Sequence, residues 1–136
     1  MTERPTILFA CIHNSGRSVA AQALTRHYAG DAVEVRSAGS EPGSTVNPVV
    51  AEVLAERGLS VDDHTPTLLD RDLVQDSDIV ITMGCGETCP VFPGKRYADW
   101  TVDDPAGQQI DAVRRIVDDI DNRVRALLRN LLPVHD

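Results

Sequence analysis

The chain lacks an excess of basic residues, a long hydrophobic run and an even set of cysteines. Its 136 residues hold 13 Lys and Arg against 21 Asp and Glu, which gives a formal net charge of −8. This balance disfavours a general nucleic-acid binder, a polybasic membrane module and, by itself, an acidic substrate. The apolar run 7–12 is too short for a signal peptide or a membrane span. We therefore expect a soluble, cytoplasmic protein.

The three cysteines are Cys11, Cys85 and Cys89. An odd count without a secretory leader does not indicate a disulfide framework, and cytoplasmic thiols stay reduced unless chemistry uses them. The four histidines are scattered and show no metal-ligand spacing. A structural zinc needs four ligands, so we expect no metal site.

Composition close to globular averages, without repeats or a long linker, predicts one domain over residues 1–136. Apolar periodicity and capping residues predict alternating strands and helices. The expected strands are 6–11, 33–38, 79–83 and 96–100, and the expected helices are 18–28, 48–58, a short one opening at 65–67, and 109–132. Such alternation predicts an α/β fold with a parallel sheet covered on both faces. Ligands in such folds bind beyond the carboxyl ends of the strands.

The last helix carries charges of opposite sign four residues apart. Such spacing predicts a solvated face held by ion pairs, each worth a few tenths of a kcal/mol. The expected pairs are Arg114 with Asp118, Arg115 with Asp119, Asp119 with Arg123, and Asp121 with Arg125.

Segment 11–18 joins the first predicted strand to the first predicted helix. A loop that curls into a helix N-terminus directs backbone N–H groups at one point, which suits a tetrahedral oxyanion. Arg17 adds a planar fork that can hold two anion oxygens. Cys11 would lie beneath the anion, where these groups favour the thiolate form that attacks as a nucleophile. Ser18 could donate a hydrogen bond to that thiolate.

Residues 85–90 have the sequence Cys-Gly-Glu-Thr-Cys-Pro. From the residues alone, Cys85 and Cys89 allow three interpretations: inert thiols, half of a metal site, or a redox pair. Two thiols four apart on a helical turn are about 6 Å apart at Cα, within reach of a disulfide. Asp103-Asp104-Pro105, taken alone, is a common turn.

Four features in chain order resemble a known family. They are Cys11-x5-Arg17-Ser18, then Ser37-Ala38-Gly39, the cysteine pair, and Asp103-Asp104-Pro105. The first resembles the anion loop of the low-molecular-weight protein tyrosine phosphatase fold. The whole pattern resembles the arsenate reductases built on that fold. The resemblance implies a four-stranded parallel sheet flanked by helices. It also implies an oxyanion-binding loop formed by Ile12, His13, Asn14, Ser15, Gly16 and Arg17.

The resemblance also implies a mechanism. Cys11 attacks arsenate, and Asp104 acts as the general acid. Cys85 and then Cys89 take over the covalent bond, so that arsenite leaves and a Cys85–Cys89 disulfide remains. No bound cofactor is implied. The disulfide is reduced by an external thiol system, either thioredoxin or mycothiol with a redoxin.

The chain departs from the best-known thioredoxin-coupled members at several positions. They have a second cysteine where this chain has Gly16, and their distal cysteines are spaced more widely. A potassium site described for some members uses Asn, Glu and Ser. Asn14 and Ser37 match it, but Gln22 replaces the acid, so we expect no metal. Asn14 is expected to shape the loop because Asn tolerates left-handed backbone conformations. We expect His13 to be an exposed loop residue.

Two alternative functions stay open at this stage. The first is a phosphatase that acts on phosphotyrosine or a small phosphate ester with the same loop chemistry. Against it, Ala106-Gly107 follows Pro105, where the phosphatases usually have aromatic residues, and a phosphatase has no use for the cysteine pair. The second is a non-enzymatic arsenite or thiol sensor, which leaves Arg17 without a role.

Overall fold

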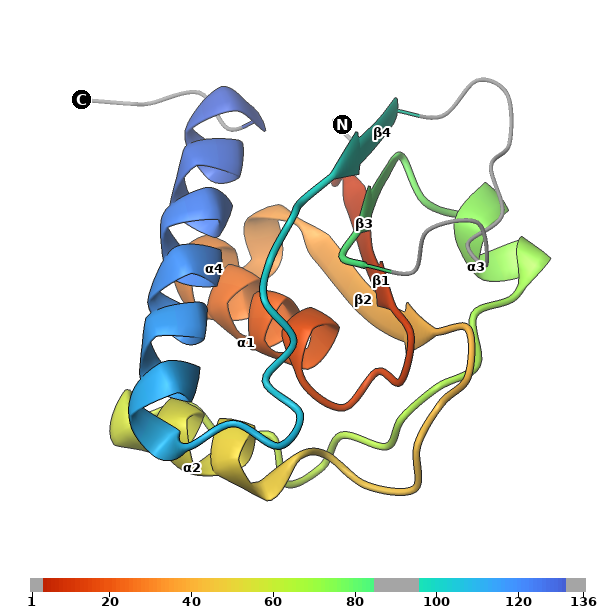
Figure 1. Ribbon diagram of the computed structural model, residues 1–136. Helices are drawn as coiled ribbons and strands as arrows, with labels where there is room; N and C mark the ends of the chain where they lie inside the picture. The colour runs from red at the N-terminus through yellow and green to blue at the C-terminus, as the bar shows by residue number, and fades with distance from the viewer. Residues whose placement is uncertain (1–3, 85–95, 132–136) are drawn as a thin grey trace.

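Four parallel strands in the described part of the chain form one sheet, in the order β2-β1-β3-β4 (Figure 1). The computed structural model describes residues 4–84 and 96–131. The strands are β1 (Thr6–Cys11), β2 (Glu34–Gly39), β3 (Ile79–Thr82) and β4 (Arg96–Asp99). The helices are α1 (Arg17–Ala29), the 3-10 turn η1 (Gly30–Ala32), α2 (Pro48–Glu56), α3 (Arg71–Gln75) and α4 (Ile110–Leu131). The predicted α/β class with a four-stranded parallel sheet flanked by helices is confirmed.

The two faces of the sheet pack against different helices. Ile7, Phe9 and Cys11 of β1 belong to the larger core, which also takes in the apolar stripes of α1, α2 and α4. Leu8 faces the other way and packs with Val74 of α3 in a smaller cluster. Because successive strand residues point to opposite faces, the alternate residues Ile7, Phe9 and Cys11 share one face of the sheet. The nucleophile candidate is therefore at the carboxyl end of a central strand, on the α1 side.

The short helix after residue 60 begins later than the sequence predicts. Thr67 and Leu69 lie in extended chain that hydrogen-bonds to Gly39, next to the end of β2. Helix α3 begins after Asp70, whose side chain accepts the Leu73 N–H at 2.8 Å. The prediction of a helix opening at 65–67 is wrong because pairing with β2 holds that stretch extended, and a better N-cap follows.

Two of the four expected ion pairs form along α4. Asp119 with Arg123 and Asp121 with Arg125 are paired at 2.9 and 3.0 Å. Arg114 instead binds Glu56 of α2 at 2.7 Å. Among the described helices, none combines the length and the apolarity that crossing a membrane requires.

Candidate active site

The loop between β1 and α1 turns its carbonyl groups away from its centre. Carbonyl oxygens of four loop residues accept N–H groups from the segment 40–47, which surrounds the loop on the outside. The bonds are Ser40 to Cys11, Glu41 to Ile12, Gly43 to His13 and Asn47 to Ser15, at 2.7–3.1 Å. Because a trans peptide directs its N–H opposite to its carbonyl, outward carbonyls leave N–H groups free to face the centre. This is the arrangement that an oxyanion needs.

Asn14 connects the loop to the sulfur of Cys11. Its φ of 50° is the one left-handed non-glycine value in the described chain, as the sequence predicts. Its backbone N–H lies 3.3 Å from Cys11 Sγ, and its side-chain Nδ2 donates to Ser18 Oγ at 2.8 Å. Ser18 Oγ lies 2.9 Å from the same sulfur. Since Ser18 accepts from Asn14, its own proton is free to point at the Cys11 sulfur, and Ser18 can donate to it.

His64 and Thr67 fix the orientation of the Asn14 amide. The Thr67 N–H donates to Asn14 Oδ1 at 2.9 Å, and His64 Nε2 lies 2.9 Å from the same oxygen. That oxygen can only accept, so His64 Nε2 carries a hydrogen and donates it to Asn14. Burial lowers the pKa of His64, and the positive charge of Arg26 adds to this effect, while the bond to Asn14 opposes it. The sequence contains no signal for this role of His64.

Lowering the pH is expected to destabilise the fold through His64. The unfolded chain takes up the proton near 6.5. The folded chain resists until the pH is lower, so stability falls as the pH drops below that value. Thermal unfolding measured between about pH 7.5 and pH 5 should show a smaller loss of melting temperature in His64→Gln than in the wild type. Glutamine still donates to Asn14 but does not titrate. Identical pH profiles for the two proteins would contradict this prediction.

Arg17 is the charged residue that the fold holds most firmly at the loop. Its guanidinium is buried, with Nη1 donating to the Val102 carbonyl at 3.3 Å and Nη2 lying 3.9 Å from Asp104 Oδ2. Gly84 lies against it: its φ is +93°, and a Cβ there would come within 2.3 Å of Nη1. Glycine is thus required at residue 84 both by the backbone conformation and by contact with the guanidinium.

Asp104 reaches the loop from the segment before α4, which runs past α1 toward α2 (Figure 1). Its Oδ1 accepts the Ala106 N–H at 3.0 Å, a bond that fixes a tight turn through Pro105. The side chain is 54% exposed, so it can exchange protons with water. The structure therefore brings Asp104 to the anion loop, where a general acid has to be.

A cavity of ≈ 20 Å³ lies between the loop and this turn. Among the described residues it is lined by Cys11, His13, Ser15, Gly16, Arg17, Asn47, Asp104, Pro105 and Ala106. Ile12 and Asn14, which the resemblance places in the oxyanion loop, are absent from this lining. Their side chains face elsewhere: Ile12 packs against Ala10, and the Asn14 amide donates to Ser18. His13 is exposed, as expected, and its Nδ1 lies 3.0 Å from the Glu41 carbonyl.

Residues 6–133 match the family described as low molecular weight phosphotyrosine protein phosphatase. The chain belongs to this family. It is 36% identical over 129 residues to arsenate reductase 1 of Bacillus cereus, covering 92% of this chain and 95% of the relative. The structure of an arsenate reductase from Archaeoglobus fulgidus matches with a TM-score of 0.76 and 35% identity, covering 90% of this chain and 98% of that one.

A thioredoxin-dependent arsenate reductase from Corynebacterium glutamicum is also similar. Its structure matches with a TM-score of 0.85 and 47% identity over 96% of this chain. The present chain spans 63% of the length of that protein. Sequence and structure thus both place this member of the low molecular weight phosphatase family close to proteins named arsenate reductase.

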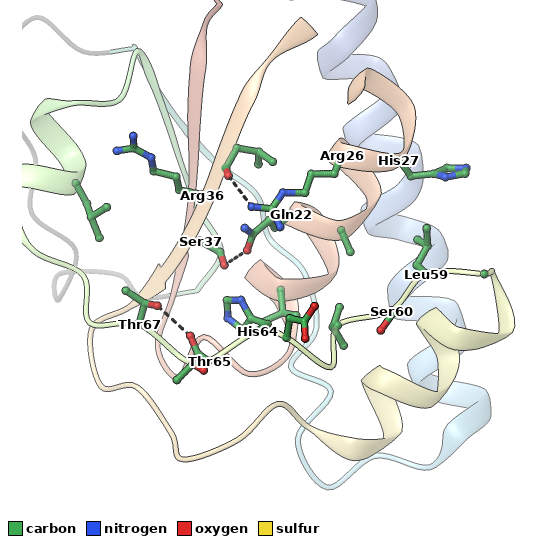
Figure 2. A pocket seen from close by; sticks show the side chains of 17 residues that line it. Gln22, Arg26, His27, Arg36, Ser37, Leu59, Ser60, His64, Thr65 and Thr67 are labelled. Carbon is green, nitrogen blue, oxygen red and sulfur yellow. Dashed lines mark hydrogen bonds between the residues drawn. The ribbon is translucent and has the colours of Figure 1, made fainter. Parts of the chain in front are cut away.

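Behind the loop of this phosphatase-family fold lies a larger cavity of ≈ 750 Å³ (Figure 2). Gln22 of α1 and Ser37 of β2 face each other there, and the Ser37 hydroxyl donates to Gln22 Oε1. Asn14 Oδ1 is already bonded by His64 and Thr67. Asn14 Oδ1 and Gln22 Oε1 already accept protein hydrogen bonds, and Gln22 brings no negative charge, so these residues do not fit the Asn, Glu and Ser cation site of some relatives. Among the described residues, no cluster of three His, Cys, Asp or Glu side chains could hold a metal.

Cys85 and Cys89 lie outside the described residues. The structure thus brings Cys11, Arg17, Ser18 and Asp104 together, and the expectation for the distal pair stays a prediction. The sequence by itself does not indicate Asn47, Gly84 or His64 as residues of the site. Asn47 was identified only as the N-cap of α2, a role that its side chain fills by accepting the N–H groups of Val49 and Val50.

Proposed function

We propose that the chain is an arsenate reductase that works by a cysteine relay. The observation that carries the proposal is the position of the Cys11 sulfur. Cys11 is 2% exposed, and its sulfur is hydrogen-bonded to Ser18 Oγ and the Asn14 N–H. It lies at a cavity that Arg17 and Asp104 also line. This geometry suits nucleophilic attack on a tetrahedral oxyanion. The named relatives support arsenate as that oxyanion, since 36% identity extends over most of both chains.

The first step uses residues that the structure places together. The Cys11 thiolate attacks the arsenic atom of arsenate, which the inward N–H groups and Arg17 hold. An oxygen leaves as water after taking a proton from Asp104, and a Cys11–arsenic bond remains. Ser18 keeps the sulfur oriented during the attack.

The second half of the cycle transfers two electrons to arsenic. The Cys85 thiolate attacks Cys11 Sγ, and a Cys11–Cys85 disulfide forms as the sulfur–arsenic bond breaks. The electron pair of that bond stays on arsenic, which leaves as arsenite. Cys89 then attacks Cys85, which frees Cys11 as a thiolate and leaves a Cys85–Cys89 disulfide.

The remaining disulfide has to be reduced by an external dithiol or thiol. The thioredoxin-dependent relative from Corynebacterium glutamicum supports thioredoxin, and mycothiol with a redoxin is the second candidate. Such a cycle requires a reducing compartment, so we propose that the protein acts in the cytoplasm. No bound cofactor takes part in these steps.

The relay predicts that neither Cys85→Ser nor Cys89→Ser turns over arsenate repeatedly. We expect both variants to stop after about one equivalent of arsenate per enzyme or fewer, because each lacks a thiol that the exchange requires. Arsenate consumption with thioredoxin and thioredoxin reductase measures this, followed by disulfide mapping. Wild type should accumulate the Cys85–Cys89 disulfide when thioredoxin is omitted, and Cys89→Ser the Cys11–Cys85 disulfide.

Thr88→Ser is the matched control, since it changes the same segment and keeps all three thiols. If Cys85→Ser and Cys89→Ser both turn over at the wild-type rate with thioredoxin, the relay is wrong. Loss of turnover in both variants with no disulfide in any of the mapped proteins would also contradict it.

A further inference from the structure

The turn that carries Asp104 rests directly on Gly16 of the anion loop. A Cβ on Gly16 would lie 2.7 Å from Pro105 Cγ and 3.6 Å from Pro105 Cδ. Both residues are buried. The φ of Gly16 is −139°, outside the left-handed region that favours glycine. What glycine provides at this position is therefore space for the proline ring.

The turn has little freedom to move away from this contact without moving the general acid. Asp104 Oδ1 is bonded to the Ala106 N–H, and the Gln108 N–H donates to the Pro105 carbonyl at 3.1 Å. Upstream, the Val102 carbonyl accepts from Arg17. Pro105 therefore moves together with Asp104, and Arg17 ties the segment to the loop just upstream at Val102. The depth at which Pro105 rests on Gly16 sets the height of the turn above the loop.

The turn lies on the side from which a leaving group departs. In an in-line displacement the leaving oxygen points away from the attacking Cys11 sulfur, toward Asp104. Arsenate carries only a hydroxyl there, whereas a phosphate monoester carries an organic group. The cavity over the loop is small, ≈ 20 Å³, and the turn lines it, so a group that extends beyond the leaving oxygen meets Asp104 and Pro105 first. Steric exclusion at this point therefore acts on the ester and spares the free oxyanion.

We propose that Gly16 determines substrate specificity: it lets Pro105 close the anion loop against organic phosphate esters while free oxyanions still bind. This inference deepens the proposed function, since it explains how the chemistry of a phosphatase loop is reserved for an inorganic substrate. A side chain at residue 16 would lift Pro105 and open the mouth of the site.

Ester hydrolysis tests this without the reductase cycle. We expect Gly16→Ala to raise kcat/KM for p-nitrophenyl phosphate about tenfold, while the inhibition constant of inorganic phosphate changes less than about threefold. p-Nitrophenolate leaves easily, so a displaced Asp104 does not mask the opening. Gly43→Ala is the matched control. It also adds a methyl group beside the loop, but its Cβ lies 3.9 Å from the His13 carbonyl oxygen, away from Pro105.

Pro105→Ala gives an independent test, because it removes the ring atoms Cγ and Cδ that a Cβ on Gly16 would meet. It should raise ester hydrolysis as Gly16→Ala does. In the Pro105→Ala background, Gly16→Ala should add less than about twofold, since the Cγ that it meets is gone. Unchanged or lowered ester hydrolysis in both single variants would overturn the proposal, as would equal gains with Gly43→Ala. Failure of wild type to reduce arsenate would refute the proposed function but leave these ester and phosphate measurements interpretable.

Discussion

Replacing Cys11 with serine is expected to abolish arsenate reduction, lowering kcat/KM by at least about 10⁴-fold. A serine hydroxyl is a weaker nucleophile, and its oxygen cannot enter the thiol–disulfide exchange that leaves electrons on arsenic. The side chain is buried at the end of β1 and close in size to serine, so the fold should be retained. Arsenate consumption under saturating thioredoxin measures the loss.

Ser18→Ala separates the nucleophile from its support. It keeps the thiol and removes the hydroxyl 2.9 Å from the sulfur, so a loss of about tenfold to hundredfold is expected. Phosphate binding, measured by calorimetry, should persist in both variants because the loop N–H groups remain. If Cys11→Ser kept more than about a hundredth of the wild-type rate, the assignment of Cys11 as the nucleophile would fail.

Replacing Arg17 with lysine should lower kcat/KM for arsenate about 10²- to 10³-fold. Lysine keeps the positive charge but loses the planar fork, which here reaches the Val102 carbonyl and Asp104 at the same time. The loss should appear in kcat as well as in KM, because the fork stabilises charge that develops on the oxyanion. Steady-state kinetics with arsenate as the varied substrate would measure both.

Arg26→Lys is the matched control, because Arg26 belongs to the same helix but donates to the Val35 carbonyl, behind the loop. It should stay within about twofold of wild type. Equal activities for Arg17→Lys and Arg26→Lys would exclude Arg17 from the site.

The Arg17→Lys variant also tests the sensor alternative. A non-enzymatic arsenite binder has no need of Arg17. If the protein were such a binder, Arg17→Lys would bind arsenite as tightly as the wild type, and the wild type itself would not turn over arsenate.

The elements at the start of the chain were predictable because their signals are local. The apolar run 6–11 and the turn after it lie beside each other in sequence, so a buried strand followed by a helix N-terminus could be inferred without knowing the rest of the fold. The N-cap Asn47 is a signal of the same kind, and its side chain caps α2 as expected. In each case the partners are within a few residues, and chain geometry brings them together.

Contacts between distant residues were harder to infer. Arg114 was expected to pair with Asp118 along α4, but it binds Glu56, which α2 brings beside it. Two exposed partners four apart gain little, so a carboxylate from a neighbouring helix with good geometry competes successfully. The late start of α3 has a similar cause, since Gly39 draws Thr67 and Leu69 into extended pairing.

The sequence by itself determined the chemistry of this protein: a cysteine, an arginine and a serine within eight residues, at the junction of a strand and a helix. Only the tertiary structure decided how that loop is supported and closed. The segment 40–47 holds its carbonyls outward, His64 orients Asn14, and Pro105 rests on Gly16 from 89 residues away. Those contacts depend on how the helices pack on the sheet, because space at an atom is set by every segment around it.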